Sequence, residues 1–398
     1  MAAILVLWSC AIGEPLEPGN VDSGKTGAAA GTGGRSTGGS GGGGGTSGNA
    51  GTRGGGDPAG AGGTAGSQSG SAGAGGATGG MAGRGGSGGL ADSGVRPDTG
   101  SGVPDSGGPI DAGSSSIVRF VAMGDTGKGT PNQVTVGEAV KRKCDADGCD
   151  FVILLGDNIY ESGVFGVDDV QWQDKFEIPY QAIALPFYAV LGNHDYGAFG
   201  LGIEFAKGPI EVAYSGRSTK WKMPATFYTL QRGNVGFVAL DTNSILWANT
   251  DNGSQSSWYA GAIAQLSTTW KIVLGHHPYL SNGTHGNAGS YTDLTGILFP
   301  EQLGMHVKTF VETHVCGTAD VYLAGHDHSR QWLEPACGME LLVSGAGAEI
   351  TALASRNPSF WESDSLGFLY VVIQGKELRG QFINLTGAVD YERVVVKP

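Results

Sequence analysis

Five short motifs each place a side chain that can bind a metal ion directly after an apolar stretch. In chain order they are MGDTG, LGDNIY, LGNHD, LGHHP and AGHDH. The residues in them that offer oxygen or nitrogen ligands are Asp125, Asp157, Tyr160, Asn193, His276, His326 and His328. Seven donors exceed the four of an ordinary zinc site, and carboxylates mixed with imidazoles suit two ions. The motifs therefore predict a two-metal centre, with Asp157 as the bridging ligand.

The spacing inside the last motif supports this prediction. On an extended chain, residues i and i+2 point to the same side, so His326 and His328 can bind adjacent ions while Asp327 turns away. A single Gly-Asp pair after a strand is usually only a turn, but five such motifs in this order argue against a purely structural role. The stretch GDTGKGT is not a phosphate-binding P-loop, because Ala122 stands where that motif needs glycine and Gly129 follows Lys128.

The elements that must position these motifs alternate between strands and helices. Short β-branched and aromatic runs predict buried strands at 117–123, 151–155, 187–191, 236–240, 271–274 and 321–324. Helices are expected at 130–143, where Thr130 is the N-cap and Pro131 the first helical residue, and at 169–183, 256–266 and 300–314. This alternation predicts an α/β sandwich, whose ligand site lies beyond the carboxyl ends of the strands.

The C-terminal third has a different pattern. The runs ELLVSG, FLYVVIQG, LRGQFINL and VDYERVVVK are typical of consecutive antiparallel strands. We therefore expect the second sheet to be mixed.

Composition divides the chain into three parts. Of the 73 glycines, 40 lie in residues 1–115, and Trp8 is the only aromatic residue before Phe120. Residues 20–115 cannot bury enough apolar surface to offset the entropy of ordering, so they are expected to form a disordered Gly/Ser/Ala-rich linker. Residues 116–398 are expected to be the catalytic domain. The net charge of −13 argues against a nucleic-acid partner.

The N-terminal residues 1–19 resemble a signal sequence. Their apolar run is too short to span a bilayer. LWSC resembles a lipoprotein cleavage box, in which Cys10 would become lipidated and tether the protein to a membrane; the alternative is an ordinary start whose cysteine has no role. We expect an extracytoplasmic protein that is secreted or tethered to the cell surface.

The other four cysteines favour disulfide bonds over a structural metal. Cys144 and Cys149 have a spacing compatible with a local bridge, and Cys316 and Cys337 bracket the AGHDH motif. Four cysteines allow three pairings, which remain open at this point. Their spacing is not that of a zinc finger.

The ordered set GDTG, GDNIY, GNHD, GHHP and AGHDHS resembles the calcineurin-like metallophosphoesterases, and within them the purple acid phosphatases of the small, tartrate-resistant type. The general family has Asp-x-His in the first motif and Asp-x-x-Asp in the second. Here the first motif lacks the histidine and Tyr160 stands in place of the second aspartate, a paired exchange that marks the purple subgroup. The resemblance implies a four-layer αββα sandwich of two mixed sheets.

The resemblance also implies a metal for each group of ligands. A ferric ion would be held by Asp125, Asp157, Tyr160 and His328, and a divalent iron, zinc or manganese ion by Asp157, Asn193, His276 and His326. Anionic carboxylates and a phenolate independently suit a trivalent ion. His194 resembles the histidine that contacts phosphate, and His285 the one that assists protonation of the leaving group. With a pKa near 6.5, an imidazole is still largely protonated at acid pH.

These expectations describe an acid phosphatase that hydrolyses small phosphate monoesters, with the two ions supplying a hydroxide nucleophile. Two alternatives remain. One is a phosphodiesterase or nucleotidase of the same fold with two divalent ions, against which Tyr160 argues. The other is a surface-tethered binding protein without catalysis, against which the complete ligand set argues. We assign no role to His306 and His314, and a supporting or packing role to His277.

Overall fold

The computed structural model describes residues 117–248, 250–300 and 303–398 of the 398-residue chain. The predicted signal region, the lipidation of Cys10 and the predicted linker lie outside the described residues. Within the described residues, no helix is both long and apolar enough to cross a membrane.

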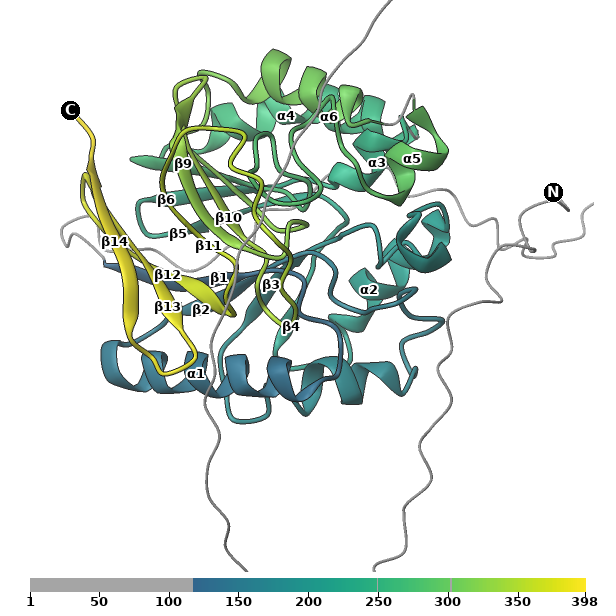
Figure 1. The fold of residues 1–398 in the computed structure, drawn as a ribbon, viewed down its shortest axis with the longest axis horizontal. Coiled ribbons are helices and arrows are strands. Elements are labelled where there is room, and N and C mark those ends of the chain that lie inside the picture. Colours follow the sequence, from purple (N-terminus) through teal and green to yellow (C-terminus); the bar gives the residue numbers. More distant parts are fainter. Residues whose placement is uncertain (1–116, 249, 301–302) are drawn as a thin grey trace, which may run out of the picture. The chain divides into compact units, whose positions relative to one another are not determined.

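Two seven-stranded mixed sheets form the centre of the fold (Figure 1). The first sheet has the order β14-β13-β12-β1-β2-β3-β4, formed by β1 (Val118–Met123), β2 (Phe151–Leu155), β3 (Phe187–Val190), β4 (Trp221–Lys222), β12 (Gly367–Gln374), β13 (Glu377–Asn384) and β14 (Val389–Val396). The second has the order β11-β9-β10-β8-β7-β6-β5, formed by β5 (Tyr228–Arg232), β6 (Val235–Ala239), β7 (Trp270–Leu274), β8 (Val321–Ala324), β9 (Arg330–Ala336), β10 (Met339–Ser344) and β11 (Ser359–Ser363). All six strands predicted from the apolar runs are present to within a residue or two.

We expected the C-terminal strands to join the second sheet, but only some of them do. β10 pairs with β8 in the second sheet, whereas β12, β13 and β14 extend the first sheet from the antiparallel edge of β1. Both sheets are therefore mixed. Strands β1, β2 and β3 of the first sheet run parallel, and so do β6, β7 and β8 of the second. The loops with the predicted ligands follow the carboxyl ends of strands in these two parallel sets.

Helices cover the outer face of each sheet. The α-helices are α1 (Pro131–Asp147), α2 (Gly208–Tyr214), α3 (Thr242–Leu246), α4 (Thr250–Gln265), α5 (Leu294–Leu298) and α6 (Met305–Phe310). Figure 1 shows α1 outside the first sheet and α3, α4 and α6 outside the second. The predicted four-layer αββα sandwich is confirmed.

Two of the predicted helices are shorter in the structure. The region 169–183 contains only a five-residue π-helical segment, η1 (Gln173–Glu177), between turns. The helix expected at 300–314 begins at Met305, because Gly304 adopts a left-handed conformation (φ 83°), and it ends in a second π-helical segment, η5 (Val311–Val315). Near its start, α1 has Thr130 as N-cap and Pro131 in the first turn, as predicted, but it continues to Asp147.

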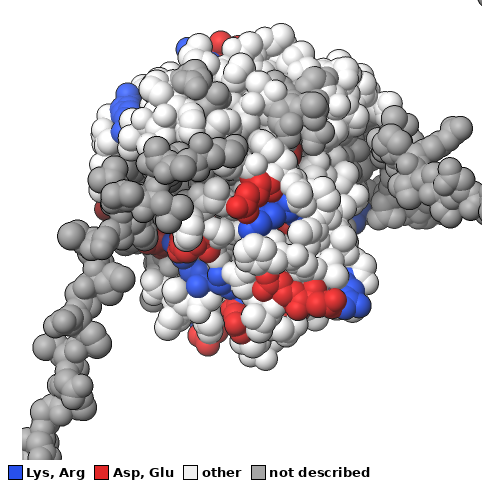
Figure 2. All heavy atoms as spheres, turned by 90° about the vertical axis from the view of Figure 1, so that its right-hand side faces the viewer, with Lys and Arg blue, Asp and Glu red and all other residues white. Residues whose placement is uncertain are grey.

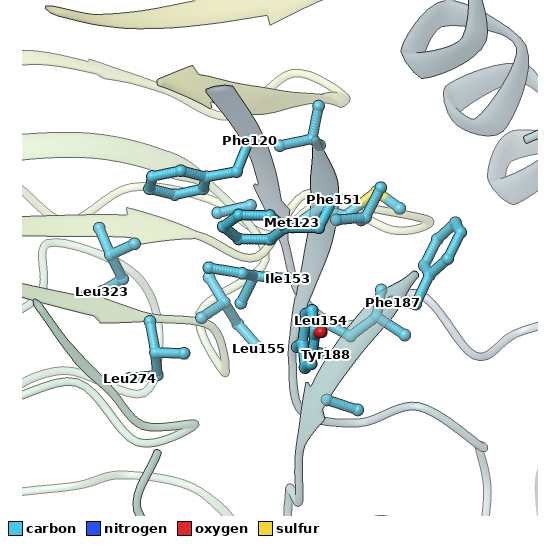
Figure 3. Packing of buried hydrophobic residues seen from close by; sticks show 14 of the residues in the cluster. Phe120, Met123, Phe151, Ile153, Leu154, Leu155, Phe187, Tyr188, Leu274 and Leu323 are labelled. Atoms are coloured by element: carbon cyan, nitrogen blue, oxygen red, sulfur yellow. The ribbon is translucent and has the colours of Figure 1, made fainter. Parts of the chain in front are cut away.

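Apolar side chains from both sheets form the core between them (Figure 3). Phe120 and Phe151 of the first sheet stack with ring centroids 5.5 Å apart, and Phe237 of β6 meets them edge-on at 5.4 and 5.7 Å. Leu274 and Leu323 contribute from the second sheet. Edge-to-face aromatic pairs stabilise a core beyond their buried area. This packing fixes the two sheets against each other and so fixes the relative positions of the loops at their strand ends.

Two disulfide bonds join the four cysteines of the described part. Cys144 of α1 pairs with Cys149 just before β2, and Cys316 pairs with Cys337 just before β10. The structure thus selects one of the three pairings that the sequence left open.

Candidate metal centre

The five motifs converge at the carboxyl ends of the strands, as predicted. Loops after β1, β2, β3, β7 and β8 carry the seven proposed ligands, which are Asp125, Asp157, Tyr160, Asn193, His276, His326 and His328. Six of the seven are buried, and the side chain of His328 is 12% exposed. Buried ionisable groups at this density need strong mutual compensation or a bound cation.

Three of these residues have an unusual backbone conformation. Asp125 (φ 58°), Asp157 (φ 53°) and His326 (φ 68°) lie in the left-handed region, which non-glycine residues rarely adopt. Each such residue costs free energy that the surrounding fold must offset, and such residues cluster at functional sites. The conformation turns each side chain sharply at its strand end and toward the other donors.

The ligand atoms sort into two groups, of which the first contains the phenol. The hydroxyl of Tyr160 donates to Asp125 Oδ1 at 3.2 Å and lies 3.0 Å from His328 Nε2. His328 Nε2 in turn lies 3.5 Å from Asp125 Oδ1. One carboxylate, one phenol and one imidazole therefore point at a common position.

The second group is centred on His276. Its Nε2 lies 2.9 Å from Asn193 Oδ1, 3.1 Å from His326 Nδ1 and 3.4 Å from Asp157 Oδ1. Asp157 also lies close enough to Tyr160 of the first group to raise the pKa of its phenol. Asp157 is thus the carboxylate that contacts both groups, which is the position that a bridging ligand requires.

The electrostatics of the two groups favour positive charge at these positions. Burial, then Asp157 and Asp125, raise the pKa of the Tyr160 phenol well above its ordinary value. Burial opposes the ionisation of Asp157, but His276 and His194 hold the pKa of its carboxyl well below the usual range. Burial likewise opposes a charge on His276, yet Asp157 raises its pKa to about 9. Protons thus occupy His276 and Tyr160 where a cation would bind, and metal ions displace protons from such ligands. The donor set fits two cations.

Two of the imidazoles are oriented by contacts outside the two groups. His276 Nδ1 lies 2.9 Å from the carbonyl oxygen of Leu155, to which its N–H donates, so Nε2 is the atom that would bind a metal ion in place of its proton. His326 Nε2 lies 3.2 Å from Asp293 Oδ2, which leaves Nδ1 facing His276. Such outer contacts orient histidine ligands and strengthen metal binding. His285, Asp293 and His326 also form a compact group of potential ligand atoms.

The two histidines assigned to substrate lie beside the two groups. The backbone N–H of His194 donates to Asp157 Oδ1 at 2.9 Å, and its ring lies 4.2 Å from that of Tyr160. The ring of His285 stacks on His326 with centroids 4.3 Å apart. Both imidazoles therefore lie directly beside residues that would hold the two ions.

The expected protonation of His285 needs correction. Burial, followed by the neighbouring His326, lowers the pKa of His285 to about 4, so its imidazole is neutral at pH 5 to 6 in the free protein. A phosphate dianion beside it would favour the charged form and raise that pKa.

Asp327 turns away from the candidate metal positions, as predicted from the His-x-His spacing. It instead accepts the backbone N–H groups of His285 at 2.7 Å and Gly286 at 3.2 Å. His277 is fully buried, with Nδ1 2.9 Å from the hydroxyl of Thr242. This arrangement agrees with the supporting role expected for His277.

A second carboxylate layer lies beneath Asp157. Asp195 accepts the backbone N–H groups of Asn158, Ile159 and Gly192 at 2.8 to 2.9 Å, which fixes the two loops that carry Asp157 and Asn193. Burial and then Asp157 raise the pKa of Asp195 to about 7. Behind it, Glu211 of α2 is completely buried, and burial and Asp195 raise its pKa well above the ordinary value.

This fold and this site define the chain as a member of the calcineurin-like phosphoesterase family, whose model matches residues 118–330. Among curated proteins it is 30% identical to tartrate-resistant acid phosphatase type 5 of Sus scrofa over 311 residues, covering 68% of this chain and 84% of that protein. It is 29% identical to the Homo sapiens protein of the same name over 315 residues, covering 69% and 90%. With purple acid phosphatase 4 of Arabidopsis thaliana the identity is 27% over 305 residues, covering 68% and 81%.

Solved structures agree on the fold. GAP50, the anchor in the inner membrane complex of Plasmodium, aligns with a TM-score of 0.56 and 20% identity, covering 71% of this chain and 90% of that one. Purple acid phosphatase PPD1 from yellow lupin (Lupinus luteus) seeds aligns with a TM-score of 0.51 and 18% identity, covering 71% and 54%. The predicted metallophosphoesterase of the purple acid phosphatase type is confirmed, and so is the predicted class of enzyme, a phosphoric monoester hydrolase.

Proposed function

We propose that this protein is an acid phosphatase that hydrolyses phosphate monoesters at a binuclear centre of ferric iron and a divalent ion. The observation that carries the proposal is the Tyr160 hydroxyl, which lies 3.2 Å from Asp125 Oδ1 and 3.0 Å from His328 Nε2. The acid phosphatases among its relatives support the reaction.

In this proposal the first group of ligands holds the ferric ion and the second the divalent ion, with Asp157 shared. Carboxylates and a phenolate match a trivalent ion, whereas an amide and neutral imidazoles suit iron(II), zinc or manganese. When bound, the two ions would supply the Lewis acidity that makes hydroxide available at acid pH and neutralises the phosphate. His194 would bind a phosphoryl oxygen, and His285 would give its proton to the departing alcohol as the P–O bond breaks.

The substrates we propose are small phosphate monoesters whose alcohol part is uncharged or weakly charged. The acidic chain gives no general attraction for polyanions. Figure 2 shows that the described acidic and basic side chains on the pictured face lie in small groups separated by uncharged atoms. We also propose an extracytoplasmic location, secreted or tethered through Cys10, as the sequence indicates.

The test combines metal analysis, visible absorption and hydrolysis on one preparation of the full chain and of Tyr160→Phe. We expect iron plus a second metal, a broad visible band that is lost in the variant, and faster turnover of p-nitrophenyl phosphate than of bis(p-nitrophenyl) phosphate at acid pH. Two divalent ions without a visible band, together with faster diester turnover, would favour the phosphodiesterase alternative. Protein without metal or turnover after iron loading would favour the non-catalytic one.

A further inference from the structure

A cavity of about 310 Å³ lies between the loops that follow β2 and β3. Its wall is formed by residues 161–163, Phe165 and Gln171 after β2, and by Ala198, Phe199, Glu204 and Lys207 after β3. These are the same two loops that carry Asp157, Tyr160, Asn193 and His194. The cavity is therefore built onto the loops of the centre, and neither its size nor its lining follows from the five motifs.

His194 connects the cavity to the centre. Its Nδ1 lies 2.7 Å from the carbonyl oxygen of Glu161, a cavity residue, while its ring contacts Tyr160. On the other side, Gly200 packs so closely that a Cβ there would lie 2.6 Å from His194 Nε2. A phosphoryl group bound by His194 thus has the cavity next to it, and the alcohol part of the ester extends from that phosphoryl group.

Two phenylalanine rings give the cavity its apolar character. Phe165 is 78% exposed and Phe199 is 71% exposed, one from each loop. Exposed aromatic side chains at the edge of a cavity are typical of binding sites. Lys207, the cation of the lining, is occupied, since its Nζ pairs with Glu204 at 2.9 Å and lies 4.0 Å from the ring centre of Phe165.

The backbone that carries Phe199 is strained. Ala198 (φ 53°) and Phe199 (φ 54°) are both left-handed, between two left-handed glycines, Gly197 and Gly200. Consecutive left-handed residues with side chains are costly and persist only where other contacts hold them. Here the Phe199 N–H donates to Ser162 Oγ at 2.9 Å, and Asn193 Nδ2 donates to the Gly200 carbonyl at 2.7 Å. The same turn therefore orients the amide ligand and exposes Phe199.

We propose that this cavity binds the alcohol part of the substrate, and that Phe165 and Phe199 select phosphate monoesters of neutral, planar aromatic alcohols. The inference rests on the proposed function and names its substrate class. Glu161 pairs with Lys128 at 3.4 Å and Glu204 pairs with Lys207 at 2.9 Å, so the described lining offers no free cation to a second phosphate, and nucleotides and other polyanionic esters gain nothing from it.

The test compares phenyl phosphate with 1-naphthyl phosphate, whose alcohols are chemically similar leaving groups that differ by one fused ring. We expect the metal-loaded wild type to favour the naphthyl ester in kcat/KM by roughly tenfold, the scale on which a hydrophobic pocket discriminates. Phe165→Ala and Phe199→Ala should bring this ratio close to one. Phe360→Ala on β11, an exposed phenylalanine that does not line the cavity, should leave it unchanged.

A binding measurement provides a readout besides turnover. Calorimetry on the same proteins should find that 1-naphthylmethylphosphonate binds the wild type more tightly than methylphosphonate does, and that both cavity variants reduce this difference. Circular dichroism and the melting temperature establish that the variants are folded.

Three results would count against the proposal. If both esters are hydrolysed with the same ratio in the wild type and the cavity variants, the inference is wrong and the phosphatase stands. If the phosphonates bind equally well to all variants, the cavity does not take the aromatic group. If no monoester is hydrolysed by iron-loaded protein, the proposed function fails and this inference fails with it.

Discussion

The carboxylate of Asp327 accepts the backbone N–H of His285 at 2.7 Å, although 42 residues separate them. Its second oxygen accepts the N–H of Gly286. Asp327 lies between His326 and His328 in sequence, so a single residue between two proposed metal ligands holds the loop of the proposed proton donor. The strand end that provides ligands also positions His285 above them.

Replacing Asp327 by alanine should therefore impair proton donation without removing metal. We expect kcat to fall by about 10-fold to 100-fold, a part of the contribution that a positioned acid makes, with unchanged metal content. Steady-state kinetics and metal analysis would measure both. If Asp327 acts through His285, the double variant Asp327→Ala/His285→Ala should be no slower than His285→Ala alone. Fully additive losses would contradict this coupling.

Asp293 gives a second prediction, about metal affinity. Its Oδ2 lies 3.2 Å from His326 Nε2, while Oδ1 accepts the N–H of Gly296 and caps α5. Asparagine keeps a capping oxygen but loses the charge that orients His326. Asp293→Asn should weaken binding of the divalent ion about 10-fold to 100-fold, the range found for such outer contacts. Titration of the metal-depleted protein with zinc measures this.

The cap provides the control for that experiment. Asp293→Ala removes both functions and should also lower the melting temperature, whereas Asp293→Asn should change it little. Zinc affinity in Asp293→Asn equal to that of the wild type would show that His326 needs no help from this carboxylate.

Most of the candidate centre could be predicted from the sequence because each motif is a pattern of neighbouring residues. Each ligand follows its own strand, so Asp125, Asp157 and Asn193 could be placed at strand ends without knowing how the strands pair. The antiparallel pairing of β12 with β1 was missed, since it joins segments about 250 residues apart that no local pattern connects. The short helix at 173–177 was predicted too long for a similar reason, because tertiary packing overrides helix propensity.

The roles of the supporting residues could not be predicted from the sequence for the same physical reason. Asp293 precedes a helix of only five residues, and the one local signal is an aspartate at an N-cap position. The sequence predicted no role for Lys128, which stands in a stretch that fails the P-loop pattern. Its partners Glu161 and Glu349 lie on distant loops, which no local pattern connects to it. The low pKa of His285 follows from burial against His326, which residue type alone does not reveal.

The buried Glu211 predicts how stability depends on pH. Within the described part of the chain, neither of its oxygens has a hydrogen-bond donor, and the nearby Asn158 Oδ1 also lacks one. A proton on Glu211 would supply that donor, consistent with the raised pKa of its carboxyl. The folded state thus keeps a proton that the unfolded chain releases above pH 4.5. The free energy of unfolding must therefore fall as pH rises above that value, until the pH reaches the folded pKa.

Glu211→Gln removes this titration while keeping the shape and a donor. Between pH 5 and pH 8 the metal-depleted wild type should lose at least about 1.4 kcal/mol of unfolding free energy relative to the variant, the equivalent of one pKa unit. Urea denaturation at both pH values measures it. Glu138→Gln on α1, whose side chain is 64% exposed, is the matched control and should follow the wild type. The same pH dependence in Glu211→Gln and wild type would mean that Glu211 is ionised in the fold.

Lys128 predicts a change in colour rather than in rate. Its Nζ lies 3.9 Å from the centre of the Tyr160 ring and pairs with Glu349 at 2.8 Å and Glu161 at 3.4 Å. Burial opposes its charge, but Glu349 and Glu161 raise the pKa of Lys128, so it remains an ammonium. A cation over the ring stabilises the electrons of the phenolate. Without it, those electrons lie higher in energy and their transfer to ferric iron needs less energy.

Lys128→Met keeps the apolar stem and removes the charge, so the visible band of the iron-loaded protein should move to longer wavelength. Lys128→Arg keeps a cation over the ring and should leave the band near its wild-type position. Metal analysis must accompany both spectra, because a loss of iron lowers the intensity of the band without moving it. An unmoved band in Lys128→Met at full iron content would mean that the charge of Lys128 is neutralised by its two carboxylates before it reaches Tyr160.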